Sequence, residues 1–196
     1  LRTYHLIIFA RNKEGLRDLY KLVSSSHIKH FYRVPRILKS ELVHVRDNLL
    51  IGSACEAGQL FRAILENMDE QEINKIARFY DFLEIQPLGN NEFLLGEKVE
   101  SLEELKKINK RIYQLGKKLK KPVVATGDVH FLDPEDSIYR EILQAGQGYE
   151  EQTQAPLYFR TTGEMLEEFS YFGEEIAREL VIENPRKIAD LCEEIQ

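Results

Sequence analysis

The sequence is poor in cysteine and has no long apolar run, and each absence excludes a class of protein. Its 196 residues include two cysteines, Cys55 and Cys192, which cannot build a disulfide framework and are typical of a reducing cytoplasm. No stretch approaches the roughly 18 apolar residues of a membrane-spanning helix. No secretory signal opens the chain. We therefore expect a cytoplasmic protein without a membrane span.

Several functional motifs are missing as well. The chain has no Gly-rich phosphate loop, no H-E-x-x-H helix and no G-x-S-x-G elbow, which disfavours nucleotide-binding folds and hydrolase triads. The net charge of −6 argues against a protein that binds duplex DNA by bulk electrostatic attraction. With 43% hydrophobic and 31% charged residues, the composition is that of one globular core. Because an apolar run follows Leu1 within a few residues, we interpret the chain as a segment of a longer protein.

Short apolar runs alternate with helical patterns along most of the chain. Each run is rich in β-branched or aromatic residues and is followed by apolar residues spaced three or four apart. The runs cover residues 4–10, 48–54, 82–86 and 123–126. This alternation predicts an α/β protein in which parallel strands form a sheet or part of a barrel.

The end of the chain differs from the rest. A polar stretch at residues 149–156 is followed by helical patterns without strands. We therefore divide the chain into a main portion, 1–157, and a helical C-terminal tail, 158–196.

Residues 24–47 have no clear periodicity. A serine run at 24–26 is expected to end the first helix, and the stretch after it mixes aromatic with basic residues around Pro35. Because loops of this length are unusual without a reason, we interpret it as a functional loop. If the protein acts on phosphate esters, the cations of this loop are candidates to hold the phosphate. A solvated basic loop is the alternative. The three candidate cations are Arg33, Arg36 and Lys39.

The last apolar run ends in a Gly-Asp-x-His sequence. Because residues two apart in an extended chain point to the same side, Asp128 and His130 would present an oxygen and a nitrogen to one divalent metal ion. The alternative is a helix-capping aspartate beside a histidine that bonds to the backbone. Cys55 and Glu56 end an earlier run, and ligands gather at the carboxyl ends of strands. The pattern therefore predicts a metal site at this rim.

Six stretches of sequence together carry a family resemblance. They resemble the PHP (polymerase and histidinol phosphatase) domain of bacterial replicative DNA polymerase III α subunits. The similar stretches occur in the same order as in that family and extend over nearly the whole chain. The motif Ser53-Ala54-Cys55-Glu56 and the later residues 158–162 are similar to the sequences of the PolC type. The six stretches are residues 4–12, 15–24, 32–37, 52–58, 80–87 and 125–131.

This resemblance implies a distorted β/α barrel with a multi-metal site at the strand ends. It implies zinc or manganese there, and magnesium for the parent polymerase. Glu56 and Glu84 lie inside matching motifs without an assigned role. For the first of the matching histidines, which sits early in its apolar run, a purely structural histidine is the alternative. The positions that match the family's ligand-bearing motifs are His5, Cys55, Asp128 and His130.

One departure from the family is an absence: its opening His-x-His motif does not occur in this sequence. The resemblance therefore implies the portion that follows an inserted proofreading exonuclease, with the first PHP portion and the polymerase core elsewhere in the parent chain. One reading is a structural, metal-binding segment of a DNA-directed DNA polymerase, a nucleotidyltransferase of DNA replication that contacts DNA through its other parts. The second is a metal-dependent phosphoesterase acting on phosphodiesters or phosphomonoesters.

Overall fold

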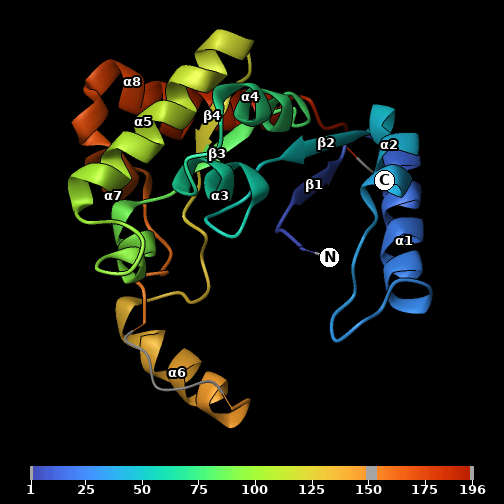
Figure 1. Ribbon diagram of the computed structural model, residues 1–196, viewed down its shortest axis with the longest axis horizontal. Coiled ribbons are helices and arrows are strands. Elements are labelled where there is room, and N and C mark those ends of the chain that lie inside the picture. Colours follow the sequence, from blue (N-terminus) through green and yellow to red (C-terminus); the bar gives the residue numbers. More distant parts are fainter. Residues whose placement is uncertain (1, 149–153, 195–196) are drawn as a thin grey trace.

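A computed structural model describes residues 2–148 and 154–194, and its strands and helices alternate along the main portion as predicted (Figure 1). Most of the polar stretch 149–156 lies outside the described residues. The strands are β1 (Ile7–Ala10), β2 (Leu49–Gly52), β3 (Leu83–Ile85) and β4 (Val123–Ala125). The helices are α1 (Lys13–Ile28), α2 (Lys39–His44), α3 (Gln59–Leu65), α4 (Glu70–Arg78), α5 (Leu102–Leu119), α6 (Ser137–Gly146), α7 (Thr162–Glu168), α8 (Glu174–Arg178) and α9 (Asn184–Ala189).

The strands pair in two different ways. β3 and β4 are parallel, with Leu83 opposite Val123, whereas β1 runs antiparallel to β2, with Ile7 opposite Gly52. The α/β class is therefore confirmed, but the expectation that all strands are parallel is wrong for β1. The reason is a contact between distant residues: Arg11 N donates to Asn48 O at 3.0 Å, so the chain leaves β1 and enters β2 at the same end. No barrel closes among the described residues.

The first helix begins after a capping asparagine and ends later than its sequence predicts. The side chain of Asn12 accepts a hydrogen bond from Gly15 N at 2.8 Å, which caps the first turn of α1. The expectation that the serine run ends this helix is wrong, because α1 continues to Ile28. Ser26 Oγ donates to Val23 O at 2.6 Å within the helix, so its hydroxyl does not need to break the backbone pattern.

The helical tail packs against the same core as the strands. Phe169 and Leu180 are fully buried in the cluster that also holds Ile51 and Ile85. Asn184 Nδ2, at the start of α9, donates to Val123 O in β4 at 2.8 Å. The tail is therefore joined to the sheet by both apolar burial and a buried hydrogen bond.

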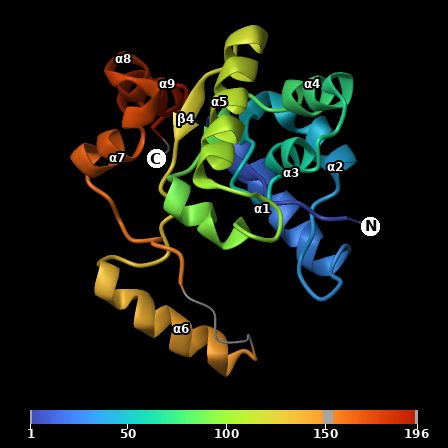
Figure 2. The same cartoon turned by 60° about the vertical axis from the view of Figure 1, so that its left-hand side comes forward.

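Helix α6 stands apart from this core in both ribbon views (Figure 2). Its side chains Ile138, Ile142 and Leu143 are more than half exposed. Among the described residues, none of the helices is both long enough and apolar enough to cross a membrane.

Candidate functional site

Two of the predicted ligands meet just beyond β2. Cys55 Sγ lies 3.6 Å from His5 Nδ1. The backbone brings them together, because His5 N donates to Ala57 O at 3.1 Å and His5 bridges to Gly58. A Cβ on Gly58 would lie 2.1 Å from Ser53 O, so this close turn requires glycine. His5 is thus placed at the strand end by β-type pairing and has a partner for its ring.

The other two predicted ligands follow β4. Asp128 has a left-handed backbone with φ 49°. His130 Nδ1 lies 2.7 Å from the backbone oxygen of Asp128. Because a carbonyl oxygen only accepts, Nδ1 carries the proton, and in a neutral ring the lone pair is on Nε2. The histidine therefore bonds to the backbone, as one alternative expected, and still keeps one nitrogen for a ligand. The aspartate that caps the following short helix, Pro134–Asp136, is Asp133 rather than Asp128.

Negative charge accumulates around Cys55. Burial raises the pKa of the Cys55 thiol, and the carboxylates of Asp128 and Glu56 raise that pKa further. The charge of Asp128, beyond β4, thus reaches the residue that follows β2. Glu56 Oε1 lies 3.6 Å from Arg62 Nη2, whereas Glu56 Oε2 is buried and has no hydrogen bond of ordinary geometry within the described residues. A bound cation would offset the negative potential that Arg62 leaves and would give this second oxygen a partner.

The Cys55–His5 pair fits one face of a zinc site. Zinc binds cysteine sulfur at about 2.3 Å and histidine nitrogen at about 2.0–2.1 Å, so two such ligands in a tetrahedron lie about 3.6 Å apart. The observed separation of 3.6 Å matches this spacing and also fits a weak S–H to nitrogen hydrogen bond. In residues 2–148 and 154–194, no group of three or more His, Cys, Asp or Glu side chains has the arrangement of a metal site. A complete site would need further ligands or movement of the strand ends.

A buried carboxylate lies directly behind these strand ends. Glu84 in β3 accepts hydrogen bonds from Ala54 N at 3.0 Å and from Thr126 Oγ1 at 3.2 Å. Its backbone N–H donates to Ser53 Oγ at 2.9 Å. Glu84 therefore links the ends of β2 and β4, the two segments that carry Cys55 and Asp128. An acid inside the apolar run 82–86 was the sequence signal for this linking role.

Replacing Glu84 with glutamine is expected to change how stability depends on pH. Burial raises the pKa of Glu84 above its usual value near 4.3, and the charge of Asp128 adds to the rise. Between that value and the raised folded pKa, the unfolded chain ionises while the folded chain stays protonated, so the free energy of unfolding falls as pH rises. Glutamine does not titrate. The free energy of unfolding of Glu84→Gln minus that of wild type should therefore be more positive at pH 7 than at pH 4.

Urea unfolding of both proteins across this pH range, with a chelator present, measures this difference. Glu164→Gln is a control of opposite sign. Hydrogen bonds from the Thr161 hydroxyl and backbone lower the pKa of Glu164. That carboxylate therefore stabilises the fold above its unfolded pKa, so the stability of Glu164→Gln relative to wild type should fall as pH rises. A pH-independent difference between Glu84→Gln and wild type would contradict the prediction.

The three candidate phosphate cations do not act as one group. The guanidinium carbons of Arg33 and Arg36 lie 5.6 and 5.1 Å from the centre of the Tyr32 ring. Lys39 Nζ instead lies 3.9 Å from the centre of the Phe79 ring. Burial lowers the pKa of Lys39, with Arg46 the next cause. The two arginines of the loop therefore lie at the same ring, whereas the lysine packs against a different one.

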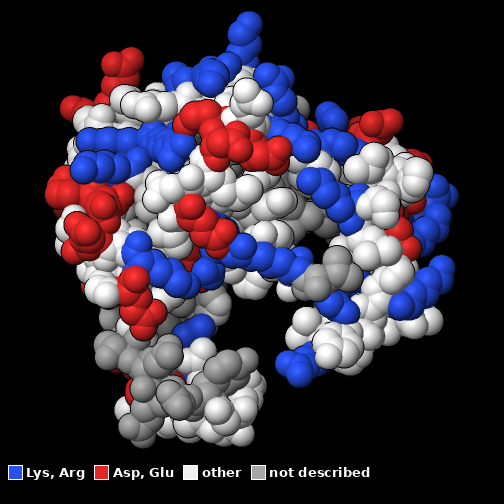
Figure 3. All heavy atoms as spheres, in the orientation of Figure 1, with Lys and Arg blue, Asp and Glu red and all other residues white. Residues whose placement is uncertain are grey.

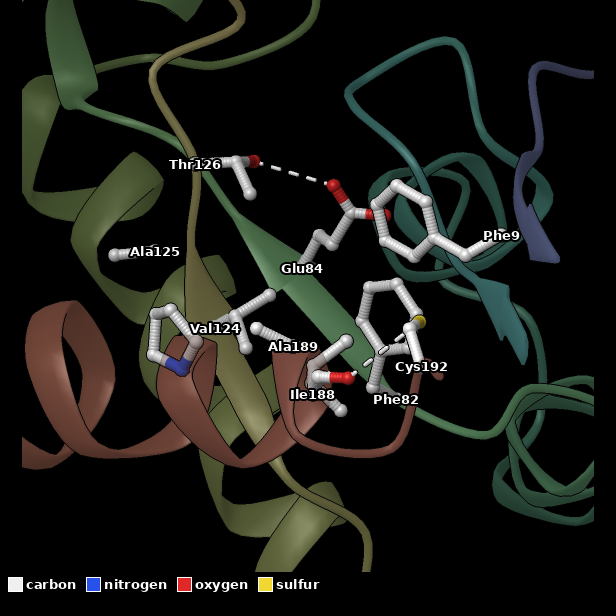
Figure 4. A pocket seen from close by; sticks show the side chains of 10 residues that line it. Phe9, Phe82, Glu84, Val124, Ala125, Thr126, Ile188, Ala189 and Cys192 are labelled. Atoms are coloured by element: carbon white, nitrogen blue, oxygen red, sulfur yellow. Dashed lines mark hydrogen bonds between the residues drawn. The ribbon is translucent and has the colours of Figure 1, made fainter. Parts of the chain in front are cut away.

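An apolar pocket of about 290 Å³ opens beside the buried carboxylate (Figure 4). Phe9 and Phe82 stack in it with ring centres 5.9 Å apart and nearly parallel planes. Glu84 lies at one side, and α9 supplies the opposite wall with Ile188. Apart from Glu84 and Thr126 the lining is apolar, so the pocket suits packing by apolar groups rather than a metal ion. Sequence patterns did not predict it, because its walls come from four distant segments.

Comparison with known proteins identifies similar sequences. Residues 2–87 match the family described as PHP domain. These residues include β1, β2 and the Cys55–His5 pair. The first half of the chain therefore matches this class of domain.

Over its full length the chain is similar to proteins named DNA polymerase III PolC-type. It is 54% identical to that of Clostridium perfringens, 58% to that of Caldanaerobacter subterraneus and 48% to that of Bacillus subtilis. In each case the alignment covers 100% of this chain and 14% of the relative. The first half of the chain thus matches the PHP domain, and the whole chain is similar to a region that makes up about one seventh of the length of the PolC-type relatives.

Proposed function

We propose that this segment is a structural, metal-binding module of a bacterial replicative DNA polymerase. The parent would be a DNA-directed DNA polymerase with 3′–5′ exonuclease activity, acting in the cytoplasm and contacting DNA through its other parts. The observation that carries the metal-binding role is the Cys55–His5 pair at 3.6 Å, next to the charge of Asp128 and to a Glu56 oxygen that has no hydrogen bond of ordinary geometry among the described residues.

The ligands we propose are His5, Cys55, Asp128 and His130, with Glu56 as a further acid that the sequence left unassigned. Zinc suits the sulfur and nitrogen donors, and manganese suits the carboxylates. When bound, the metal would supply a cross-link between strand ends that the hydrogen bonds of Glu84 already hold near one another. The remaining ligands would come from the first PHP portion of the parent chain.

We also propose that the rest of the parent chain completes a distorted barrel around this segment. Two observations support completion. β1 has a strand partner on one side only among the described residues, and Phe9 on β1 is 44% exposed. The apolar pocket beside Phe9 has the character of a core that lacks one wall. Additional strands that pair with β1 would cover the free edge of β1 and the open side of the pocket.

A second candidate function is metal-dependent hydrolysis of phosphodiesters or phosphomonoesters. The exposed ring of His130, with its proton fixed on Nδ1, favours this role, because Nε2 is free to bind a metal or accept a proton. The module would then act on a substrate of its own rather than only join strand ends.

Metal analysis and a hydrolysis assay on the complete polypeptide separate these functions. We expect stoichiometric zinc or manganese in the wild type and a lower content in Asp128→Asn. An absence of bound metal would contradict the metal-binding module. Hydrolysis of a chromogenic phosphodiester after metal is restored, lost in His130→Ala, would replace the structural role with the enzymatic one. Metal binding without hydrolysis would support the structural role.

A further inference from the structure

The segment around the loop between α1 and α2 is basic although the chain as a whole is acidic; residues 105–127 form a second stretch without an acidic residue. The whole sequence has 33 Asp and Glu against 27 Lys and Arg. Residues 19–40 contain no acidic residue, and they end just before Glu41. Their cations are Lys21, Lys29, Arg33, Arg36 and Lys39. Lys and Arg side chains accordingly lie over the lobe formed by α1 and the following loop (Figure 3).

The loop is held closed at its base and exposed at its tip. Glu41 accepts from Ser25 Oγ at 3.1 Å and lies 3.0 Å from His30 Nε2, so the nearest acid is engaged at the base. At the tip, Tyr32 N donates to Val34 O at 3.2 Å, and Arg33 between them has φ 64°. This turn presents Arg33 to solvent, away from the carboxylate.

Two aromatic rings are exposed beside the arginines. Phe31 is 56% exposed and Tyr32 is 61% exposed. Arg33 and Arg36 both lie against the Tyr32 ring, at 5.6 and 5.1 Å. We call this set of residues, Phe31, Tyr32, Arg33 and Arg36, the aromatic–arginine tip. Such exposed ring–cation contacts add little to the stability of a fold, so they do not explain why two large rings are exposed.

We propose that the aromatic–arginine tip binds single-stranded nucleic acid, with the rings stacking on bases and the arginines contacting phosphates. Exposed rings flanked by cations are the features that single strands require, since each base offers a flat face and each nucleotide an anion. Duplex DNA fits less well, because its bases are already stacked on one another and offer no free face. A protein partner would be recognised by an apolar centre depleted of charge, and this tip alternates rings with cations.

Photo-crosslinking on the complete polypeptide tests the location of binding. An oligothymidylate with one 5-iodouracil is irradiated with the protein, and the crosslinked peptides are sequenced by mass spectrometry. We expect crosslinks at Phe31 or Tyr32. The yield there should fall at least about fivefold in Tyr32→Ala, the lower end of a lost stacking contact, and should survive in Tyr32→Phe. Crosslinks confined to other segments would overturn the proposal.

The salt dependence of binding tests the arginines. Each phosphate contact with a single strand contributes about 0.7 to the slope of log affinity against log salt concentration. Replacing Arg33 and Arg36 together with glutamine should lower that slope by about 1.4. The matched control replaces Lys107 and Lys118, two exposed lysines of α5, with glutamine and should leave the crosslink at the tip unchanged. An equal loss in both double variants would show that only net charge matters and would overturn the proposal.

A third outcome would assign the tip to protein contact. If Tyr32→Ala lowered the melting temperature of the complete polypeptide while no oligonucleotide crosslinked to the tip, the rings would be packing against another part of the chain. That result would also overturn the proposal. The tip and its tests do not depend on the metal-binding module, because they involve none of its ligands and can be measured with a chelator present.

Discussion

Replacing Phe169 with alanine is expected to lower the free energy of unfolding by about 3–5 kcal/mol, the usual cost of deleting a buried aromatic ring. Phe169 is fully buried although it lies in the C-terminal tail. Its ring centre is 6.2 Å from that of Tyr171, whose hydroxyl accepts from Asn109 Nδ2 on α5 at 2.9 Å. The cavity left by the substitution would therefore open between the tail and the long helix. Urea unfolding of the two proteins measures the difference.

Phe159→Ala is the matched control, since it makes the same chemical change at a ring that is 59% exposed. We expect its effect to stay within about 0.5 kcal/mol, as for most surface substitutions. Similar small effects for both variants would show that the tail contributes little to the core. A large effect of Phe169→Ala with an unchanged dependence on urea concentration would show that tail and sheet unfold together.

Replacing Cys55 with alanine is expected to lower the affinity of the complete polypeptide for zinc by more than about 100-fold, because even the loss of a residue that only orients a ligand costs 10–100-fold. The substitution removes the sulfur and leaves His5, 3.6 Å away, without its partner. The negative charge of Asp128 and Glu56 remains in place, so a loss of affinity reports the sulfur itself. Competition with a chromophoric chelator measures the affinity.

Cys192→Ala is the control for this experiment, because it removes the only other cysteine of the chain. Cys192 lines the apolar pocket, and its thiol faces Ile188 O at 3.9 Å, so zinc affinity should not change. His5→Ala should weaken zinc binding as Cys55→Ala does, and it is the safer variant for folding because His5 is exposed. Equal zinc affinity in wild type, Cys55→Ala and His5→Ala would remove both residues from the proposed ligands.

Local rules predicted the elements well where each element's own residues decide its structure. The four apolar runs all contain a strand, as the sequence indicates. The end of α1 was predicted wrongly, because serine is indifferent in a helix and its side chain can bond back to the preceding turn. Strand direction was also beyond these rules: the alternation of strands and helices does not record that Arg11 and Asn48 meet.

The candidate site shows the same division. The strand-end rule and the family resemblance led to Cys55 and Asp128, and the structure places the charge of one within reach of the other. Neither source indicated that Lys39 would pack on Phe79 instead of remaining with the arginines. Packing of a lysine stem on a ring depends on which helix lies across from it, and this information is not local.

The sequence by itself determined the family resemblance, most of the elements and the choice of candidate ligands, because composition, periodicity and sequence motifs are properties of neighbouring residues. The tertiary structure alone decided which of these residues come together. It brought His5 to Cys55 through a backbone pairing and linked two strand ends through buried Glu84. It also placed the tail on the sheet and separated Lys39 from Arg33 and Arg36. These outcomes depend on contacts between segments distant in the chain, whose free energies no local pattern encodes.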